Sequence, residues 1–142
     1  MESAHGHSWR VSVEIVATEL DGEGMAFDFV AARRALLVAD LHLEKASWFA
    51  AGRQMLPPFD TRATLHQLTK LADQHDAREI WALGDNFHDS AGPDRLDNAA
   101  LAALASVYET TKRYDSAIRT YDRIPAGTPI QMSIEVRKAL LL

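Results

Sequence analysis

The 142 residues of this chain allow one compact domain or two small units, and a net charge of −5 with a pI near 5.6 gives no overall attraction to nucleic acid. No apolar run approaches the roughly 20 residues of a membrane span and no secretory signal is present, so we expect a cytoplasmic protein that does not enter a membrane. The absence of cysteine excludes disulfides and thiolate zinc sites, which leaves histidine, carboxylate and amide groups as metal ligands.

The first predicted elements are two strands that form a hairpin. Residues 11–20 alternate apolar and other side chains, which is the period of a half-buried strand. A turn signal at residues 21–24 leads into a second strand over residues 25–30. His5 and His7 precede this hairpin in a polar N-terminal tail that we expect to be disordered.

A strand, a helix and a second strand are predicted next. Residues 35–39 are all apolar and end at Asp40, which is typical of a strand buried on both faces, although this pattern alone leaves a buried helix open. An amphipathic helix follows over residues 61–75, and residues 79–83 form a buried strand just before Asp85. This order makes a right-handed crossover with parallel strands, so Asp40 and Asp85 should emerge at the same sheet edge.

Four polar side chains at that edge form a candidate metal site. Asp40 and His42 are separated by one residue, so an extended backbone sends both to the same side. Asp85 ends the neighbouring strand, and His88 lies in the loop behind it. A carboxylate between two metal ions can bridge them, and such a pair can generate hydroxide and bind a phosphoryl group. The structural alternative is a pair of carboxylates that cap loops, with two ordinary loop histidines.

The two motifs together resemble a known family. The segments LLVADLHLEKASWFAAGRQMLPPFDTRATL and WALGDNFHD are similar to the calcineurin-like metallophosphoesterases, and most of all to the ligase-associated DNA damage response phosphoesterases, over about residues 10–97. The resemblance implies an α/β fold, the front half of a metallophosphoesterase β-sandwich with a crossover helix. It also implies that Asp40 and His42 bind one metal and that Asp85 bridges to a second. His88 is expected to be catalytic, by supporting either the bridging loop or the substrate phosphate.

The downstream part of the family pattern is missing. That pattern continues with a Gly-Asn-His segment and a Gly-His-x-His ending, whereas no histidine follows His88 and Asn98 is the only later asparagine. We therefore expect one weakly held divalent ion, Mn²⁺, and weak or no hydrolysis of a phosphodiester, for which DNA is one candidate substrate. His66 and His75 lie on or beside the crossover helix and are expected to be solvated or packing residues.

The C-terminal residues follow another pattern. Residues 98–131 resemble one 34-residue tetratricopeptide repeat, with a helical hairpin whose apolar positions are Leu101, Leu104, Tyr108 and Tyr121. A generic amphipathic hairpin is the alternative. We expect these side chains to pack against the sheet or another chain, because a single repeat cannot bury its apolar faces.

The predicted organisation is a composite of two parts. Residues 1–97 form a partial metallophosphoesterase domain, and residues 98–142 form tetratricopeptide-like, all-α helices. We expect a truncated or chimeric phosphodiesterase, joined near residues 90–100 by engineering, by nature or by an error of gene prediction. The alternative function is a non-catalytic scaffold that binds a protein partner through its C-terminal helices.

Overall fold

The computed structural model describes residues 18–20, 22, 24, 34–57 and 60–142, and the chain divides into two compact units, residues 1–30 and 31–142. The expected strands of the N-terminal hairpin lie almost wholly outside the described residues, as do His5 and His7. Of the expected turn at residues 21–24, only residues 22 and 24 are described, in a turn and a bend. The elements below all belong to the second unit.

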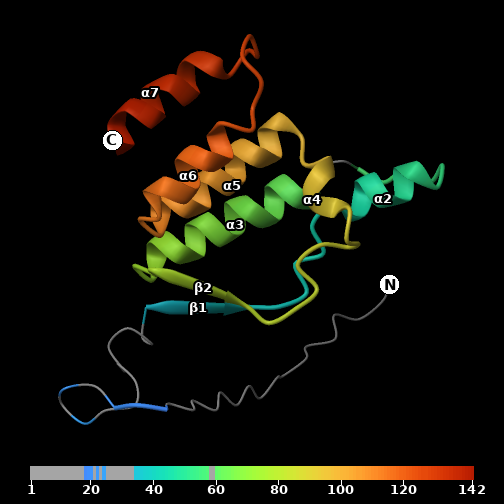
Figure 1. Cartoon of the computed structure of the whole chain (residues 1–142). Coiled ribbons are helices and arrows are strands. Elements are labelled where there is room, and N and C mark those ends of the chain that lie inside the picture. The colour runs from blue at the N-terminus through green and yellow to red at the C-terminus, as the bar shows by residue number, and fades with distance from the viewer. Residues whose placement is uncertain (1–17, 21, 23, 25–33, 58–59) are drawn as a thin grey trace. The chain divides into compact units, whose positions relative to one another are not determined.

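Two parallel strands and a crossover helix form the first part of this unit (Figure 1). Strand β1 (Ala35–Val38) pairs with β2 (Glu79–Ala82), with Ala35 opposite Glu79 and Val38 opposite Ala82. Helix α3 (Asp60–Gln74) connects them. The predicted strand, helix and parallel strand are therefore confirmed, and they arise from short apolar runs on either side of a segment with helical periodicity. The expected burial of the strands on both faces is wrong, because every residue of β1 and β2 is half-buried or exposed.

The two backbone segments stay paired beyond the ends of β1 and β2. The backbone N–H of Leu83 donates to the Val38 carbonyl at 2.8 Å, and that of His42 donates to the Asp85 carbonyl at 2.9 Å. Leu43 and Phe87 then form an isolated parallel bridge. The segments that follow β1 and β2 thus run side by side, which places the side chains of both segments at one end of the sheet.

Helix α3 lies between the sheet and the C-terminal helices (Figure 1). Leu65 and Leu68 of α3 pack with Leu43 on the sheet side and with Ala103 and Val107 on the helical side. Leu65 is 1% exposed. Because helix positions 65 and 68 share one face, a single stripe of α3 contributes to a core that spans both parts of the unit.

Five further helices complete the described part of the chain: α2 (Lys45–Ala51), α4 (Gly92–Arg95), α5 (Asn98–Thr110), α6 (Tyr114–Tyr121) and α7 (Gln131–Leu141). The Asp97 carboxylate caps α5 by accepting a hydrogen bond from the Ala100 N–H at 2.6 Å. Helices α5, α6 and α7 bury a second cluster that includes Leu101, Tyr121 and Ile134.

This architecture is mixed α/β, as expected. The more detailed features that the resemblances implied are not seen in the described residues. The described residues show neither a β-sandwich nor a repeated unit. The helices after residue 98 are confirmed, and Leu101 and Tyr121 lie in their core. The division at residue 97 stays a prediction. None of the helices in the described part of the chain is long and apolar enough to cross a membrane.

Candidate metal site

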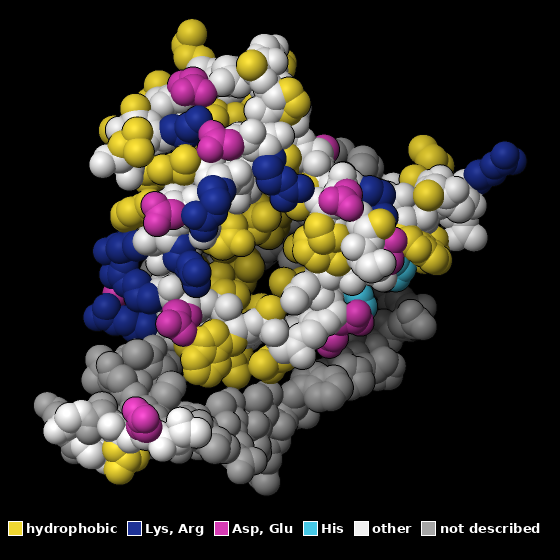
Figure 2. Space-filling view, in the orientation of Figure 1, with side chains coloured by type: hydrophobic (Ala, Val, Ile, Leu, Met, Phe, Trp, Pro, Cys, Tyr) yellow, Lys and Arg dark blue, Asp and Glu magenta, His cyan; other side chains and the backbone are white. Residues whose placement is uncertain are grey.

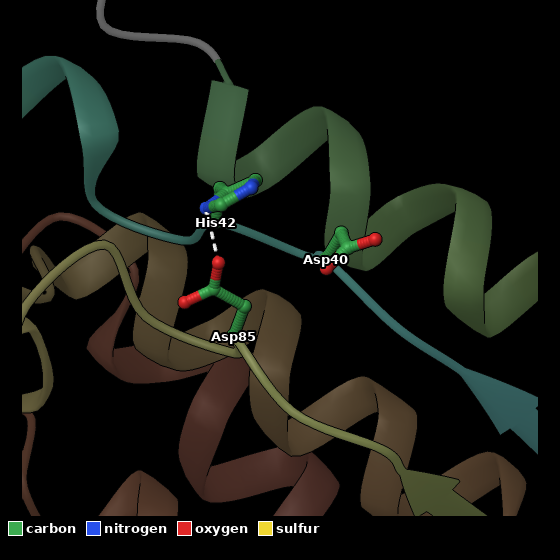
Figure 3. A group of neighbouring side chains, drawn as sticks. All are labelled: Asp40, His42 and Asp85. Atoms are coloured by element: carbon green, nitrogen blue, oxygen red, sulfur yellow. Dashed lines mark ion pairs between the residues drawn. The ribbon is translucent and has the colours of Figure 1, made fainter.

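The side chains of Asp40, His42 and Asp85 converge at the carboxyl ends of β1 and β2 (Figure 3). One ligand atom from each residue lies within 4.8 Å of the others. Asp40 and His42 follow β1, whereas Asp85 follows β2 and directs its carboxylate at the His42 ring. Figure 2 shows histidine and acidic side chains next to each other at the surface below α2. The three predicted metal ligands are therefore brought together.

The backbone at this cluster adopts a conformation that few side chains tolerate. Asp40, His42 and Asp85 have φ of 52°, 45° and 51°, in the left-handed region. Gly84, at φ 137°, precedes Asp85. Left-handed backbone at a residue other than glycine costs on the order of 1 to 3 kcal/mol and persists where surrounding contacts impose it. Here the paired segments impose it on all three candidate ligands.

The His42 ring offers a nitrogen suited to a metal ion. Its Nδ1 atom is buried, has no hydrogen-bond partner in the described part of the chain, and lies 3.6 Å from Asp85 Oδ2. Ligands about 2.0 to 2.1 Å from a tetrahedral zinc ion lie roughly 3.3 Å from one another. The observed separation is too long for a hydrogen bond and close to that ligand spacing. One imidazole and two carboxylates are also a donor set that divalent transition metals accept.

The site is open to solvent on one side. The Asp40 and Asp85 side chains are exposed, and the His42 side chain is 39% exposed although its Nδ1 atom is covered. Three protein ligands on an accessible surface leave coordination positions for water or a substrate, which distinguishes reactive metal sites from closed structural ones.

His88 lies beside the cluster but does not belong to it. Its ring is 6.0 Å from the His42 ring, edge-on, and contacts Trp48 and Phe49 of α2. The catalytic role expected for His88 stays a prediction. His66 is exposed on α3 and His75 follows that helix, and neither joins the cluster, as expected.

An ion pair within the segment after β2 positions a guanidinium that also bonds α2. The Arg95 guanidinium donates two hydrogen bonds to the Asp89 carboxylate, and its Nε donates to the Ser47 hydroxyl at 2.9 Å. The hydrogen bond from Arg95 holds the pKa of Asp89 below its usual value of 3.8, and the same bond raises the pKa of Arg95. Both side chains are more than two-thirds covered, so this pair stabilises the loop that carries Asp85 and His88.

A second network holds the segment after β1 against α3. Glu44 is 8% exposed and accepts a hydrogen bond from the Thr61 hydroxyl at 3.0 Å, while its own N–H donates to that hydroxyl at 2.8 Å. The Ala46 N–H donates to the Asp60 carboxylate at 3.0 Å. Sequence reasoning missed Glu44, because a glutamate in a polar stretch carries no signal of burial.

A family model for 6-pyruvoyl tetrahydropterin synthase matches residues 1–69. This range is just under half of the chain and contains Asp40 and His42, but it ends before Asp85 and His88. No curated protein and no solved structure gives a significant match to the chain.

The synthase match overturns the phosphoesterase interpretation. The matching family differs from the one that the two motifs implied, and no comparison supports a phosphodiesterase or a tetratricopeptide scaffold. The wrong inference has a physical reason. Short polar motifs at the ends of parallel strands predict where side chains converge, but they do so in many unrelated families and therefore do not identify one. The expected cluster is present, but the metallophosphoesterase family and its activity were wrongly inferred from it.

The match also covers a signal that the sequence interpretation discounted. His5 and His7 lie within residues 1–69 and are separated by one residue, directly before the alternating segment at residues 11–20. Imidazole nitrogens are ligands that zinc accepts. Both lie outside the described residues, so the expectation of a disordered tail has no structural test.

Proposed function

We propose that Asp40, His42 and Asp85 bind one divalent transition-metal ion. The observation that carries this proposal is the buried Nδ1 atom of His42, which has no hydrogen-bond partner among the described residues and faces the Asp85 carboxylate. A buried polar atom without a partner costs about 1 to 3 kcal/mol, and a metal ion would remove that cost. The left-handed backbone at all three residues supports the same function.

The donor set favours zinc over the manganese expected from the sequence. For a given set of nitrogen and oxygen ligands, Zn²⁺ binds more tightly than Mn²⁺. Enzymes of the family that matches residues 1–69 are zinc-dependent. When bound, such an ion would polarise a carbonyl or lower the pKa of a bound water. The protein groups hold the ion, and the accessible side of the cluster admits the molecule that it acts on.

Calorimetric titration of the purified chain with Zn²⁺ and with Mn²⁺ tests this function. We expect one site, occupied more tightly by Zn²⁺, that Asp85→Asn abolishes. Asparagine tolerates left-handed backbone, so this variant removes the charge without forcing the loop to rearrange. Asp76→Asn is the matched control, because Asp76 is also an exposed aspartate with positive φ, at 46°, but is paired with Arg78 outside the cluster. Equal binding by Asp85→Asn and the unchanged chain would refute the site.

The family match supports a second candidate function, a zinc-dependent synthase activity of the pterin type. It predicts that the zinc-loaded chain forms 6-pyruvoyl tetrahydropterin, and that substitution of His5 and His7 by alanine abolishes this activity. Failure of the zinc-loaded chain to form this product would remove the synthase candidate and leave the metal site at Asp40, His42 and Asp85 unaffected.

A further inference from the structure

No hydrogen bond from another described residue fixes the orientation of the His42 ring. Neither ring nitrogen bonds a group in the described part of the chain, and only the 3.6 Å approach of Asp85 involves the ring electrostatically. A metal-bound histidine almost always donates its second N–H to a carboxylate, a carbonyl or water, which fixes both the ring and its tautomer. A packing contact can orient this ring in place of a hydrogen bond.

The His42 ring is contacted by another aromatic ring. The His88 ring lies 6.0 Å from the His42 ring at an interplanar angle of 61°, an edge-on arrangement. Edge-on contacts at 4.5 to 7 Å are favourable for aromatic pairs. This contact comes from the segment after β2, which also carries Asp85.

The His88 ring is itself held in place. Trp48 packs edge-on at 4.8 Å and Phe49 stacks at 5.8 Å with an interplanar angle of 30°. The backbone N–H of His88 donates to the Leu43 carbonyl at 2.9 Å, which fixes the residue in the paired segments. Its ring is thus surrounded by three aromatic neighbours from α2 and from the segment after β1, and it can transmit that rigidity to His42.

We propose that His88 is a positioning residue for His42. Its ring, held by Trp48 and Phe49, keeps Nδ1 of His42 directed at Asp85 and so prepares the nitrogen to bind the metal ion. This inference rests on the proposed metal-binding function. It assigns the role to the shape of the His88 ring and requires neither of its nitrogens.

Two substitutions at His88 separate ring shape from ring chemistry. Phenylalanine keeps an aromatic ring and removes both nitrogens, whereas alanine removes the ring. We expect His88→Ala to weaken Zn²⁺ binding by about 10- to 100-fold, the usual effect of losing a group that orients a metal ligand. His88→Phe should bind within about threefold of the unchanged chain. In the metal-free protein, nitrogen NMR of His42 should show the tautomer protonated at Nδ1, facing the Asp85 carboxylate, in the unchanged chain and in His88→Phe, and mixed tautomers in His88→Ala.

Two outcomes would overturn the inference. Binding by His88→Phe as weak as that by His88→Ala would mean that a nitrogen of His88 is itself a ligand. Unchanged affinity and an unchanged tautomer in His88→Ala would mean that the ring does not position His42. Absence of zinc binding by the unchanged chain would instead refute the proposed function, while the tautomer measurement on metal-free protein still tests the positioning role.

Discussion

Leu43 and Phe87 form a parallel bridge beyond the last paired residues of β1 and β2. The Leu43 N–H donates to the Asn86 carbonyl at 2.9 Å, and the Leu43 carbonyl accepts from the His88 N–H at 2.9 Å. The three candidate metal ligands lie between this bridge and the strand ends. Each ligand-bearing segment is therefore fixed at both of its ends, which explains how the chain maintains left-handed backbone at all three candidate ligands.

Phe87 of this bridge lies close against Gly92. A Cβ atom built on Gly92 would lie 2.7 Å from Cδ1 and 2.9 Å from Cβ of Phe87. We expect Gly92→Ala to lower the free energy of unfolding by about 1 to 3 kcal/mol, because overpacking displaces neighbouring groups. Urea unfolding measures this, with Gly22→Ala as control, since nothing lies within 4 Å of a Cβ at that position. Equal stability of the two variants would show that Phe87 moves aside without lowering the free energy of unfolding.

Leu65 joins the sheet to the C-terminal helices. Its side chain is 1% exposed and packs with Leu43, Ala103 and Val107. We expect Leu65→Ala to lower the free energy of unfolding by about 2 to 5 kcal/mol and to loosen the segment that carries the metal ligands, because Leu43 belongs to the same buried cluster. Leu71→Ala on the same helix is the matched control, at 40% exposed, and should cost far less. Similar losses for both variants would contradict the core as described.

The strands and the long helices could be predicted because their signals are local. An apolar run ending at Asp40, a helical stripe on α3 and a second run before Asp85 are sufficient to predict a parallel pair and a common sheet edge. The convergence of Asp40 and His42 was predicted from extended backbone. They converge instead with φ of 52° and 45°, a conformation that the residue types do not signal.

Helix α2 could not be predicted, because tertiary contacts determine it. Its N-cap, Glu44, has φ 63° and makes no side-chain cap. The helix is held instead by the bond from the Ala46 N–H to Asp60 and by the bond from Arg95 to the Ser47 hydroxyl. Arg95 lies 48 residues from Ser47, so no local sequence pattern predicts this hydrogen bond. The same holds for the ring contacts of His88, which come from this helix.

The ion pair between Asp89 and Arg95 predicts a loss of stability in acid. The hydrogen bond from Arg95 lowers the pKa of Asp89 in the folded chain. A carboxylate with a lowered folded pKa contributes stability above its unfolded pKa of about 3.9, and that contribution is lost as the pH falls through the folded value. Asp89→Asn should be less stable than the unchanged chain at pH 6, and the difference should shrink below about pH 4.

Thermal unfolding from pH 7 to pH 2 measures this difference. Arg95→Gln is the control, because without the guanidinium the Asp89 carboxylate loses the main cause of its lowered pKa. This variant should lose the same pH-dependent part of the stability. A difference between Asp89→Asn and the unchanged chain that stays constant down to pH 2 would contradict the ion pair.

Zinc should stabilise the folded chain through Asp40, His42 and Asp85. A ligand that binds only the folded state adds about 2.7 kcal/mol at a free concentration of 100 times its Kd. For a chain of this size that corresponds to a rise in Tm of roughly 5 to 10 °C. The rise should grow with the logarithm of the zinc concentration and disappear when a chelator is added, because the ion stabilises by mass action.

Asp40→Asn should reduce this rise in Tm, since this variant replaces a charged ligand without disturbing the left-handed backbone, whereas Asp76→Asn should keep the rise in full. A melting temperature independent of zinc, or an equal rise in Asp40→Asn, would show that the ion binds elsewhere or only to the unfolded chain.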